Sequence, residues 1–259
     1  IRYDIGPEFS VAFTPSPGLS FNGVFRQPLE GTIEDSDITS DSVLPKVRTD
    51  AVLYAQQSDF EINRLTADYV FRPGKDLFGR VSFGYLENFF GGVSGELLWY
   101  PIDSRLAMGV EVNYARQRDF DMLFGFRDYD VLTGHASAYY DFGRGYLGQL
   151  DVGRYLAGDW GATFTLDREF NNGFRIGGYF TLTEVPFDEF GEGAFDRGIR
   201  FSVPLSWLTG QPSRRRVSRT IQPILRDGGA RLAVANRLFE STRDYRGQEL
   251  AQGWGRFYR

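Results

Sequence analysis

The sequence predicts an all-β fold, a transmembrane antiparallel up-and-down β-barrel of about 12–14 strands with a partly irregular or helical C-terminal tail. Two observations lead to this prediction. Apolar and polar residues alternate along most of the chain, as in "GELLWYPIDSRLAMGVEVNY" at residues 95–114. The alternating segments run for about 9–11 residues, the length of a tilted strand that crosses a bilayer.

The composition agrees with one large β domain. The chain has 259 residues, of which 42% are hydrophobic and 16% aromatic, and its 31 glycines suit many tight turns. It has no cysteine, which excludes a disulfide framework and a thiolate metal site. The formal net charge of -5 provides no basic field for a phosphate backbone, so nucleic acid is not an expected partner.

The alternating segments follow one another with short joints, which favours a meander over a Greek-key sandwich. In chain order, the expected strands cover residues 8–14, 19–27, 47–56, 62–72, 78–87, 92–100, 105–115, 120–129, 131–142, 146–155, 161–170, 174–183 and 197–205. The apolar faces of paired strands must match across each turn. They match where Phe142 opposes Tyr146, Glu169 opposes Arg175 beside Phe170 and Phe174, and Trp99 opposes Leu106.

The two faces of these strands predict different surroundings. The apolar face is expected to meet lipid, and its clearest members are Leu97, Trp99, Met108 and Val110. The polar face is expected to line a lumen, where arginine should be tolerated even at the acidic positions. The candidate residues for a glycan path in that lumen are Tyr100, Tyr139, Tyr155, Tyr179, Glu96, Glu111, Asp151 and Arg175. A soluble β protein with its polar face in water is the alternative.

The chain divides into a β-barrel domain at residues 1–205 and a C-terminal linker and tail at residues 206–259. The linker holds four arginines, at positions 214, 215, 216 and 219, and a further strand is expected over residues 229–239 before a polar or helical end. Two long acidic connections, residues 27–46 and 184–198, should share one rim. The chain begins at Ile1 without signal-peptide features, so we expect a processed chain or an excised domain.

Three segments carry a family resemblance: "ENFFGGVSGELLWYP", "GRYLAGDWGATFTLDREFNNGFRIGGYFTLTEVPFDEFGEGAFDRGIRFSVPL" and "RDGGARL". They resemble the carboxy-terminal region of the YjbH family of outer-membrane exopolysaccharide proteins, and the resemblance spans nearly the whole chain. It implies a Gram-negative outer-membrane β-barrel, encoded with polysaccharide secretion partners and related to group 4 capsule proteins. Family members are larger, and the family supplies no established catalytic residues.

One group of residues raises the question of catalysis. His135 lies on the polar face with Ser137, and the expected register puts Asp151 opposite Ser137. The group lacks a nucleophile elbow and lies in the lumen, so we interpret it as a hydrogen-bond network and predict no catalytic residue and no enzyme. A single histidine and scattered carboxylates predict no metal site, and no cofactor is expected.

The expected function is that of an outer-membrane β-barrel component of exopolysaccharide, or capsule-like, biosynthesis and secretion that conducts or holds the glycan. Its expected partners are outer-membrane lipid, the exopolysaccharide and other proteins of the secretion operon, and its expected location is the bacterial outer membrane. Two alternatives remain open. One is a general porin or small-solute channel, and the other is an outer-membrane lipid or glycan hydrolase.

Overall fold

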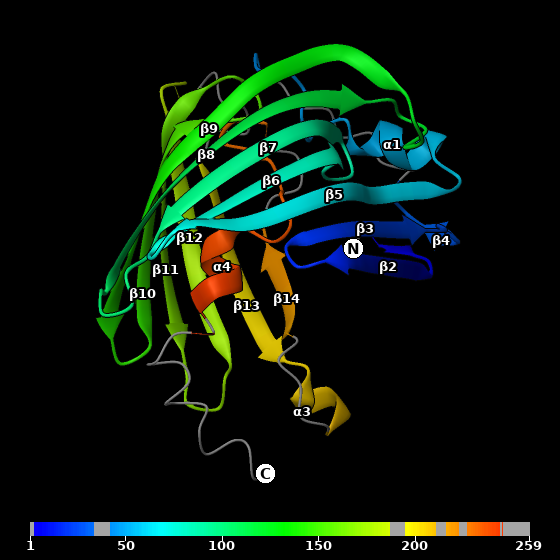
Figure 1. Cartoon of the computed structure of the whole chain (residues 1–259). Coiled ribbons are helices and arrows are strands. Elements are labelled where there is room, and N and C mark those ends of the chain that lie inside the picture. Colours follow the sequence, from blue (N-terminus) through cyan, green and yellow to red (C-terminus); the bar gives the residue numbers. More distant parts are fainter. Residues whose placement is uncertain are drawn as a thin grey trace.

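A computed structural model describes residues 3–33, 42–186, 195–210, 216–222, 227–243 and 245. In this part of the chain, twelve strands form one curved antiparallel sheet, with β2 at one edge and β14 at the other (Figure 1). The strands are β2 (Glu8–Ser16), β3 (Leu19–Arg26), β5 (Glu61–Gly74), β6 (Leu77–Tyr85), β7 (Phe90–Trp99), β8 (Leu106–Arg118), β9 (Phe126–Gly143), β10 (Tyr146–Arg154), β11 (Trp160–Glu169), β12 (Arg175–Thr183), β13 (Asp196–Pro204) and β14 (Arg216–Ile221). The predicted up-and-down order is confirmed, and the number of strands lies in the predicted range.

Smaller elements accompany the sheet. The short strands β1 (Asp4–Ile5) and β4 (Glu30–Gly31) pair with each other. The helices are α1 (Ala51–Gln57), α3 (Ser206–Thr209) and α4 (Leu238–Arg243). None of the described helices is long and apolar enough to cross a membrane. Within the described residues β2 and β14 do not pair, so the sheet curves around α4 without closing.

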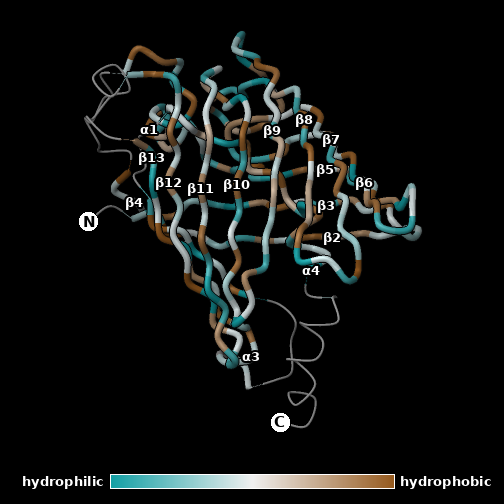
Figure 2. Tube along the Cα trace, turned by 90° about the vertical axis from the view of Figure 1, so that its left-hand side faces the viewer, coloured by the Kyte–Doolittle hydropathy of each residue, from teal (hydrophilic) through white to brown (hydrophobic). Residues whose placement is uncertain are grey.

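The convex and concave faces of the sheet differ in composition. Hydrophobic and hydrophilic residues alternate along the strands (Figure 2). Leu97, Trp99, Met108 and Val110 point outward, each between 41% and 49% exposed. The concave face instead buries charged side chains, among them Arg80, Glu111 and Asp151. The period-2 alternation therefore sorts the residues onto two faces as the sequence predicts.

The strand ends define two rims. One rim, here called the wide rim, carries the connections at residues 27–60, 86–89, 119–125 and 155–159, and the opposite rim carries tighter turns such as residues 17–18 and 75–76. The two long acidic connections begin at the wide rim, because β3 and β12 both end there. Their central parts, residues 34–41 and 187–194, lie outside the described residues.

The expected strand over residues 47–56 is wrong, because α1 occupies most of it. Three successive backbone N–H groups, from Val47 to Thr49, donate to the carboxylate of Asp227 and leave no ladder for a neighbouring strand. The helix then turns the buried Tyr54 ring onto Phe89 at 4.4 Å between centroids. Good helix formers such as alanine and glutamine fill the segment, so local propensity agrees with the helix.

The expected break between strands 120–129 and 131–142 is also wrong. Residues 119–125 form a loop, and β9 then runs without interruption through Asp130, which pairs with Arg116 of β8. No glycine or proline stands near residue 130 to end the strand. The period-2 pattern continues across that point, as one long strand requires.

Of the three predicted hairpin pairings, the one that sets Glu169 opposite Arg175 is confirmed. The predicted pair of Phe142 with Tyr146 is wrong, because Tyr146 pairs with Gly143 at a bulge beside the turn, but the register farther along the strands holds, with Ser137 opposite Asp151. The third is wrong by two residues, because Trp99 opposes Met108 instead of Leu106. Residues 100–105 make a wider loop, since the Tyr100 N–H donates to Asp76 and the following Pro101 has no N–H to donate.

The C-terminal region differs most from the prediction. β14 lies inside the expected irregular linker and adds to the sheet beside β13. The expected strand over residues 229–239 is wrong, because residues 230–237 form an irregular segment that leads into α4. Its backbone donors bind side chains of the sheet: the Ala233 N–H donates to Glu87, and the Leu238 N–H donates to Glu96. A ladder with another strand is therefore not needed to satisfy them.

Candidate functional site

Residues 227–243, here called the inner segment, lie against the concave face of the sheet. The segment starts at the wide rim, where the Asp227 carboxylate accepts the N–H groups of Val47, Arg48 and Thr49 at 2.9, 2.7 and 3.0 Å. The Gly229 N–H donates to Asp159 at 2.8 Å. Burial raises the pKa of Asp159, and the Gly229 N–H partly opposes this by stabilising the charged carboxylate. The start of the segment is thus fixed by backbone donors rather than by side-chain packing alone.

Three arginines, six residues apart, connect the inner segment to the sheet. Arg231 binds Asp151 at 2.9 Å, Arg237 binds Glu111 at 2.9 and 3.0 Å, and Arg243 lies 3.4 Å from Glu169. Glu169 belongs to the end of β11 at the rim opposite the wide rim. The ion pairs therefore follow the concave face from one rim toward the other.

Apolar side chains hold the same segment at two places. Near the wide rim, Leu232 packs with Leu86, Phe90 and Leu156. Farther along, Leu238 and Phe239 of α4 enter a second cluster with Leu98, Ala107, Tyr139 and Leu147. The Phe239 ring stacks on Tyr139 with centroids 3.8 Å apart and an interplanar angle of 8°. The polar concave face is thus interrupted by two apolar patches, and the inner segment covers both.

Glu96 and Glu111 lie directly opposite each other on β7 and β8. Two like charges at that spacing repel each other, and Arg80, which is fully buried, lies near both at 3.0 and 3.5 Å. Arg237 and the Leu238 N–H add further donors from the inner segment. Arginine at either position would face this group of cations, so the expected tolerance of arginine at Glu96 and Glu111 conflicts with the geometry.

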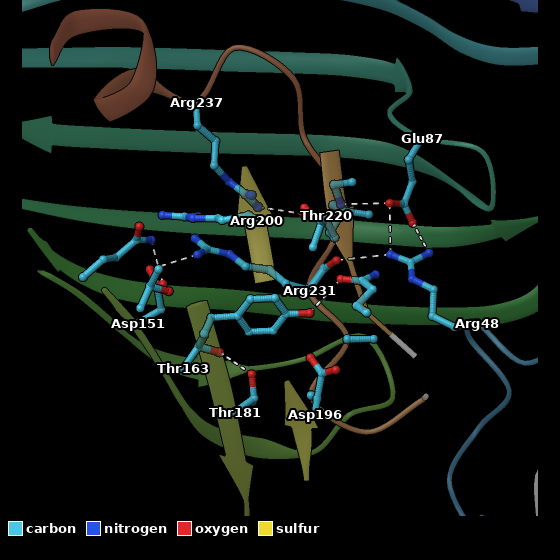
Figure 3. Close-up of a pocket in the computed structure, with 18 of the residues that line it drawn as sticks. Arg48, Glu87, Asp151, Thr163, Thr181, Asp196, Arg200, Thr220, Arg231 and Arg237 are labelled. Carbon is cyan, nitrogen blue, oxygen red and sulfur yellow. Dashed lines mark hydrogen bonds and ion pairs between the residues drawn. The ribbon is translucent and has the colours of Figure 1, made fainter. Parts of the chain in front are cut away.

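A cavity of about 600 Å³ remains between the inner segment and strands β10 to β14 (Figure 3). Among the residues that the sequence analysis selected, Tyr139, Asp151 and Tyr179 line it. The Tyr179 hydroxyl donates to Gln222 at 2.6 Å, and Asp151 accepts from Gln149 at 2.7 Å. Three of the candidate residues and several residues of the inner segment therefore line the same cavity.

The other candidate residues take structural positions around the cavity. Tyr155 is fully buried and its hydroxyl lies 2.6 Å from Thr163, while Tyr100 packs on Phe239 with centroids 5.4 Å apart. Arg175 donates to Glu169 at 2.5 Å at the rim opposite the wide rim. Glu96 and Glu111 bind the inner segment as described above. These five do not line the cavity.

The group His135, Ser137 and Asp151 does not form a proton relay. Ser137 donates to Asp151 at 2.5 Å, but both ring nitrogens of His135 lack a hydrogen-bond partner among the described residues. The His135 ring meets the Tyr155 ring edge at 4.7 Å between centroids instead. In the same part of the chain, no group of three or more metal-ligating side chains is found.

The sequence did not point to Arg200, Arg231, Arg237 or the threonines of the cavity wall as site residues. Arg200 of β13 donates to Asp167 of β11 at 2.8 Å, past the intervening strand β12. Arg231 and Arg237 belong to the C-terminal region, where a linker and a strand were expected. One signal pointed to the inner segment: Phe90, Leu98, Val131 and Leu147 are apolar residues on the polar face. Such residues need a cover, and a segment of the same chain provides it.

The structure defines an antiparallel meander whose exposed outer face is apolar and whose polar inner face is covered by its own C-terminal segment. A model of the family described as "Exopolysaccharide biosynthesis protein YbjH" matches residues 1–244. The chain belongs to this YjbH family.

Two known proteins are similar to the chain. The "Uncharacterized lipoprotein YjbH" of Escherichia coli strain K12 is 42% identical over 210 residues, which cover 79% of this chain and 30% of that protein. The chain therefore spans about a third of the length of this relative. "OmpT (in-vitro folded), an outer membrane protein of Vibrio cholerae" is 10% identical with a TM-score of 0.34, over 76% of this chain and 72% of that one.

Proposed function

We propose that the protein is an outer-membrane β-barrel component of exopolysaccharide biosynthesis and secretion, and that it holds the glycan on its concave face. Membership of the exopolysaccharide biosynthesis family supports the process. The barrel, the outer membrane and the contact with glycan are our inference from the geometry. Outer-membrane lipid, the glycan and other secretion proteins are the partners that this function requires.

The observation that carries the membrane part of the proposal is the apolar convex face. Large hydrophobic side chains are exposed on successive strands, for example Leu97, Val110, Leu150 and Phe164. Soluble proteins rarely expose a continuous apolar surface of this kind, whereas the lipid-facing side of a membrane barrel requires one. Aromatic side chains at the strand ends, such as the exposed Trp99 and Trp160, suit the two membrane interfaces.

A bilayer also sets a requirement on the edges of the sheet. Backbone groups at membrane depth need hydrogen-bond partners, and the edge strands β2 and β14 each present one unpaired side among the described residues. In lipid, both edges must therefore be paired.

The inner segment favours holding glycan over free conduction. The segment covers the concave face. Its arginines, among them Arg231 and Arg243, form ion pairs with carboxylates of the sheet, and its residues Leu232 and Leu238 are buried. A general porin keeps an open aqueous channel along this path. The cavity beside the segment is lined by hydroxyl, amide and ring groups, which are the groups that contact sugars.

A deletion strain tests the proposed function. We expect loss of the gene to reduce exopolysaccharide at the cell surface, and expression of the wild-type protein to restore it. The protein should fractionate with the outer membrane and show heat-modifiable mobility, as a folded barrel does. Unchanged surface glycan in the deletion strain would contradict the role in secretion, and recovery in the soluble fraction would contradict the barrel.

A further inference from the structure

The cavity beside the inner segment has an unusual balance of charge. Its lining includes four arginines, and each of them faces a carboxylate: Arg48 binds Glu87 at 2.6 Å, Arg231 binds Asp151 at 2.9 Å, and Arg237 binds Glu111 at 2.9 Å. Arg200, labelled in Figure 3, makes the fourth pair, with Asp167. An anionic ligand would have to compete with these carboxylates for the guanidinium groups. A neutral ligand meets no such competition.

The wall of the cavity offers groups that suit a neutral hydroxylated ligand. Thr163, Thr165, Thr181 and Thr220 lie on three strands of the sheet, and Gln149 and Gln222 add side-chain amides. Hydroxyl and amide groups both donate and accept hydrogen bonds, as the hydroxyls of a sugar do. Because the hydroxyl and amide groups of the wall can donate to and accept from the hydroxyls of a sugar, the wall favours a saccharide over an apolar ligand.

Some polar groups of the cavity wall have no hydrogen-bond partner among the residues that the structure describes. Thr163 and Thr181 bond each other at 2.8 Å, but the side chains of Thr165 and Thr220 make no hydrogen bond to a described residue. The Nε of Arg231 is buried and likewise lacks a partner in the described part of the chain. Thr165 is buried, and buried polar groups are normally hydrogen-bonded, so its hydroxyl is available to a ligand. Thr220 lies on the edge strand β14 and is exposed, so its hydroxyl is open to ligand and solvent alike.

We propose that this cavity is a binding site for a short neutral saccharide segment, with Thr165 and Thr220 as hydrogen-bonding residues and the inner segment as its floor. The proposal rests on the proposed function and names the site and the ligand class for it. The volume of about 600 Å³ lies in the range of small-molecule sites. Tyr139, Tyr179 and Phe239 add ring surface for the C–H faces of the sugar.

Binding to the whole chain, refolded in lipid vesicles, tests the site. The probes are a panel of neutral trisaccharides with gluco, galacto and manno configurations in several linkages, and a matched panel of uronic-acid trisaccharides. Calorimetric titration should show at least one neutral trisaccharide that binds more tightly than every uronic-acid probe. Binding of no neutral probe, or tighter binding of a uronic-acid probe, would overturn the proposal.

A double variant locates the site. Thr165→Val with Thr220→Val removes two hydroxyls at nearly constant volume, and we expect the dissociation constant for the neutral probe to rise about fivefold to a hundredfold. Thr14→Val, on the exposed edge strand β2, is the matched control and should leave binding unchanged. Equal affinity in the double variant and the wild type would remove the cavity as the site. Heat-modifiable mobility confirms that each variant folds.

The outcomes separate this proposal from the proposed function. If the deletion strain loses surface glycan but no neutral trisaccharide binds, the role in secretion stands and the site falls. If neutral trisaccharides bind but the deletion leaves surface glycan unchanged, the site stands and the role in secretion falls.

Discussion

Strands β7 and β8 show two faces of one sheet that follow different rules. On the concave face, Glu96 opposes Glu111, and one residue further along, Leu97 opposes Val110 on the convex face. The two carboxylates depend on specific partners, including Arg80 and Arg237. The side chains of Leu97 and Val110 carry no charge and no hydrogen-bonding group, so they need only be apolar. The inner face of these two strands is therefore specified by pairs of charged groups, and the outer face by its apolar composition.

Among the variants that test this difference between the faces, Glu111→Gln should cause the largest loss of stability. The Glu111 carboxylate lies 2.9 Å from Arg237, 3.6 Å from Arg231 and 3.5 Å from Arg80, and the amide would leave these cations without their shared counter-charge. Loss of one partner from a buried ion pair costs about 3–5 kcal/mol. We expect the free energy of unfolding in lipid vesicles, measured by urea titration, to fall by that amount.

Glu240→Gln is the matched control for this prediction. Glu240 also pairs with two arginines, Arg175 and Arg243, but at 3.8 Å and with its side chain 52% exposed. Exposed ion pairs contribute at most about 1 kcal/mol. Equal losses for the two variants would show that burial of Glu111 does not matter, and would end the distinction between the faces.

Leu97→Arg and Val110→Arg test the outer face. Arginine on the lipid side of a membrane barrel costs about 2–4 kcal/mol near the bilayer midplane and less near the interfaces. We expect each variant to lower the free energy of folding into vesicles by that amount, whereas Leu97→Met should change it by less than about 1.5 kcal/mol. If arginine is tolerated at both positions, the convex face does not meet lipid.

The sequence predicted the sheet well because its evidence is local. Alternation sorts residues onto two faces, and a turn such as Asn171-Asn172-Gly173 fixes which residues pair, as Glu169 and Arg175 do. Where a turn lacks this chemistry, prediction failed: the loop after Trp99 shifted the register by two residues. The predicted strand at residues 47–56 is wrong for a different reason. The backbone N–H groups at the start of this segment donate to the carboxylate of Asp227, which lies far away in the chain.

The candidate site could be predicted only in part. Alternation placed Tyr139, Asp151 and Tyr179 on the concave face, where the cavity lies. It could not show that residues 227–243 cover this face, because the alternating residues "ARLAVANRLF" resemble a strand. A strand would donate its backbone N–H groups to a neighbouring strand. The N–H groups of this segment instead donate to side-chain carboxylates of the sheet, such as those of Glu87 and Glu96. Long-range partners of this kind leave no periodic trace in the sequence.

Tyr155→Phe should give the smallest effect, because it removes a single hydroxyl from the inner face. Tyr155 is fully buried, and its hydroxyl lies 2.6 Å from Thr163 Oγ1. Thr163 keeps a second bond, to Thr181 at 2.8 Å, so its hydroxyl is not left without a partner. We therefore expect the free energy of unfolding to fall by about 0.5–1.5 kcal/mol. Tyr140→Phe removes the same atom from an outward-facing ring that is 43% exposed, and should change the value by less than about 0.5 kcal/mol. Urea titration of both variants measures the difference, and a larger loss at Tyr140 would reverse the assignment of specific pairs to the inner face.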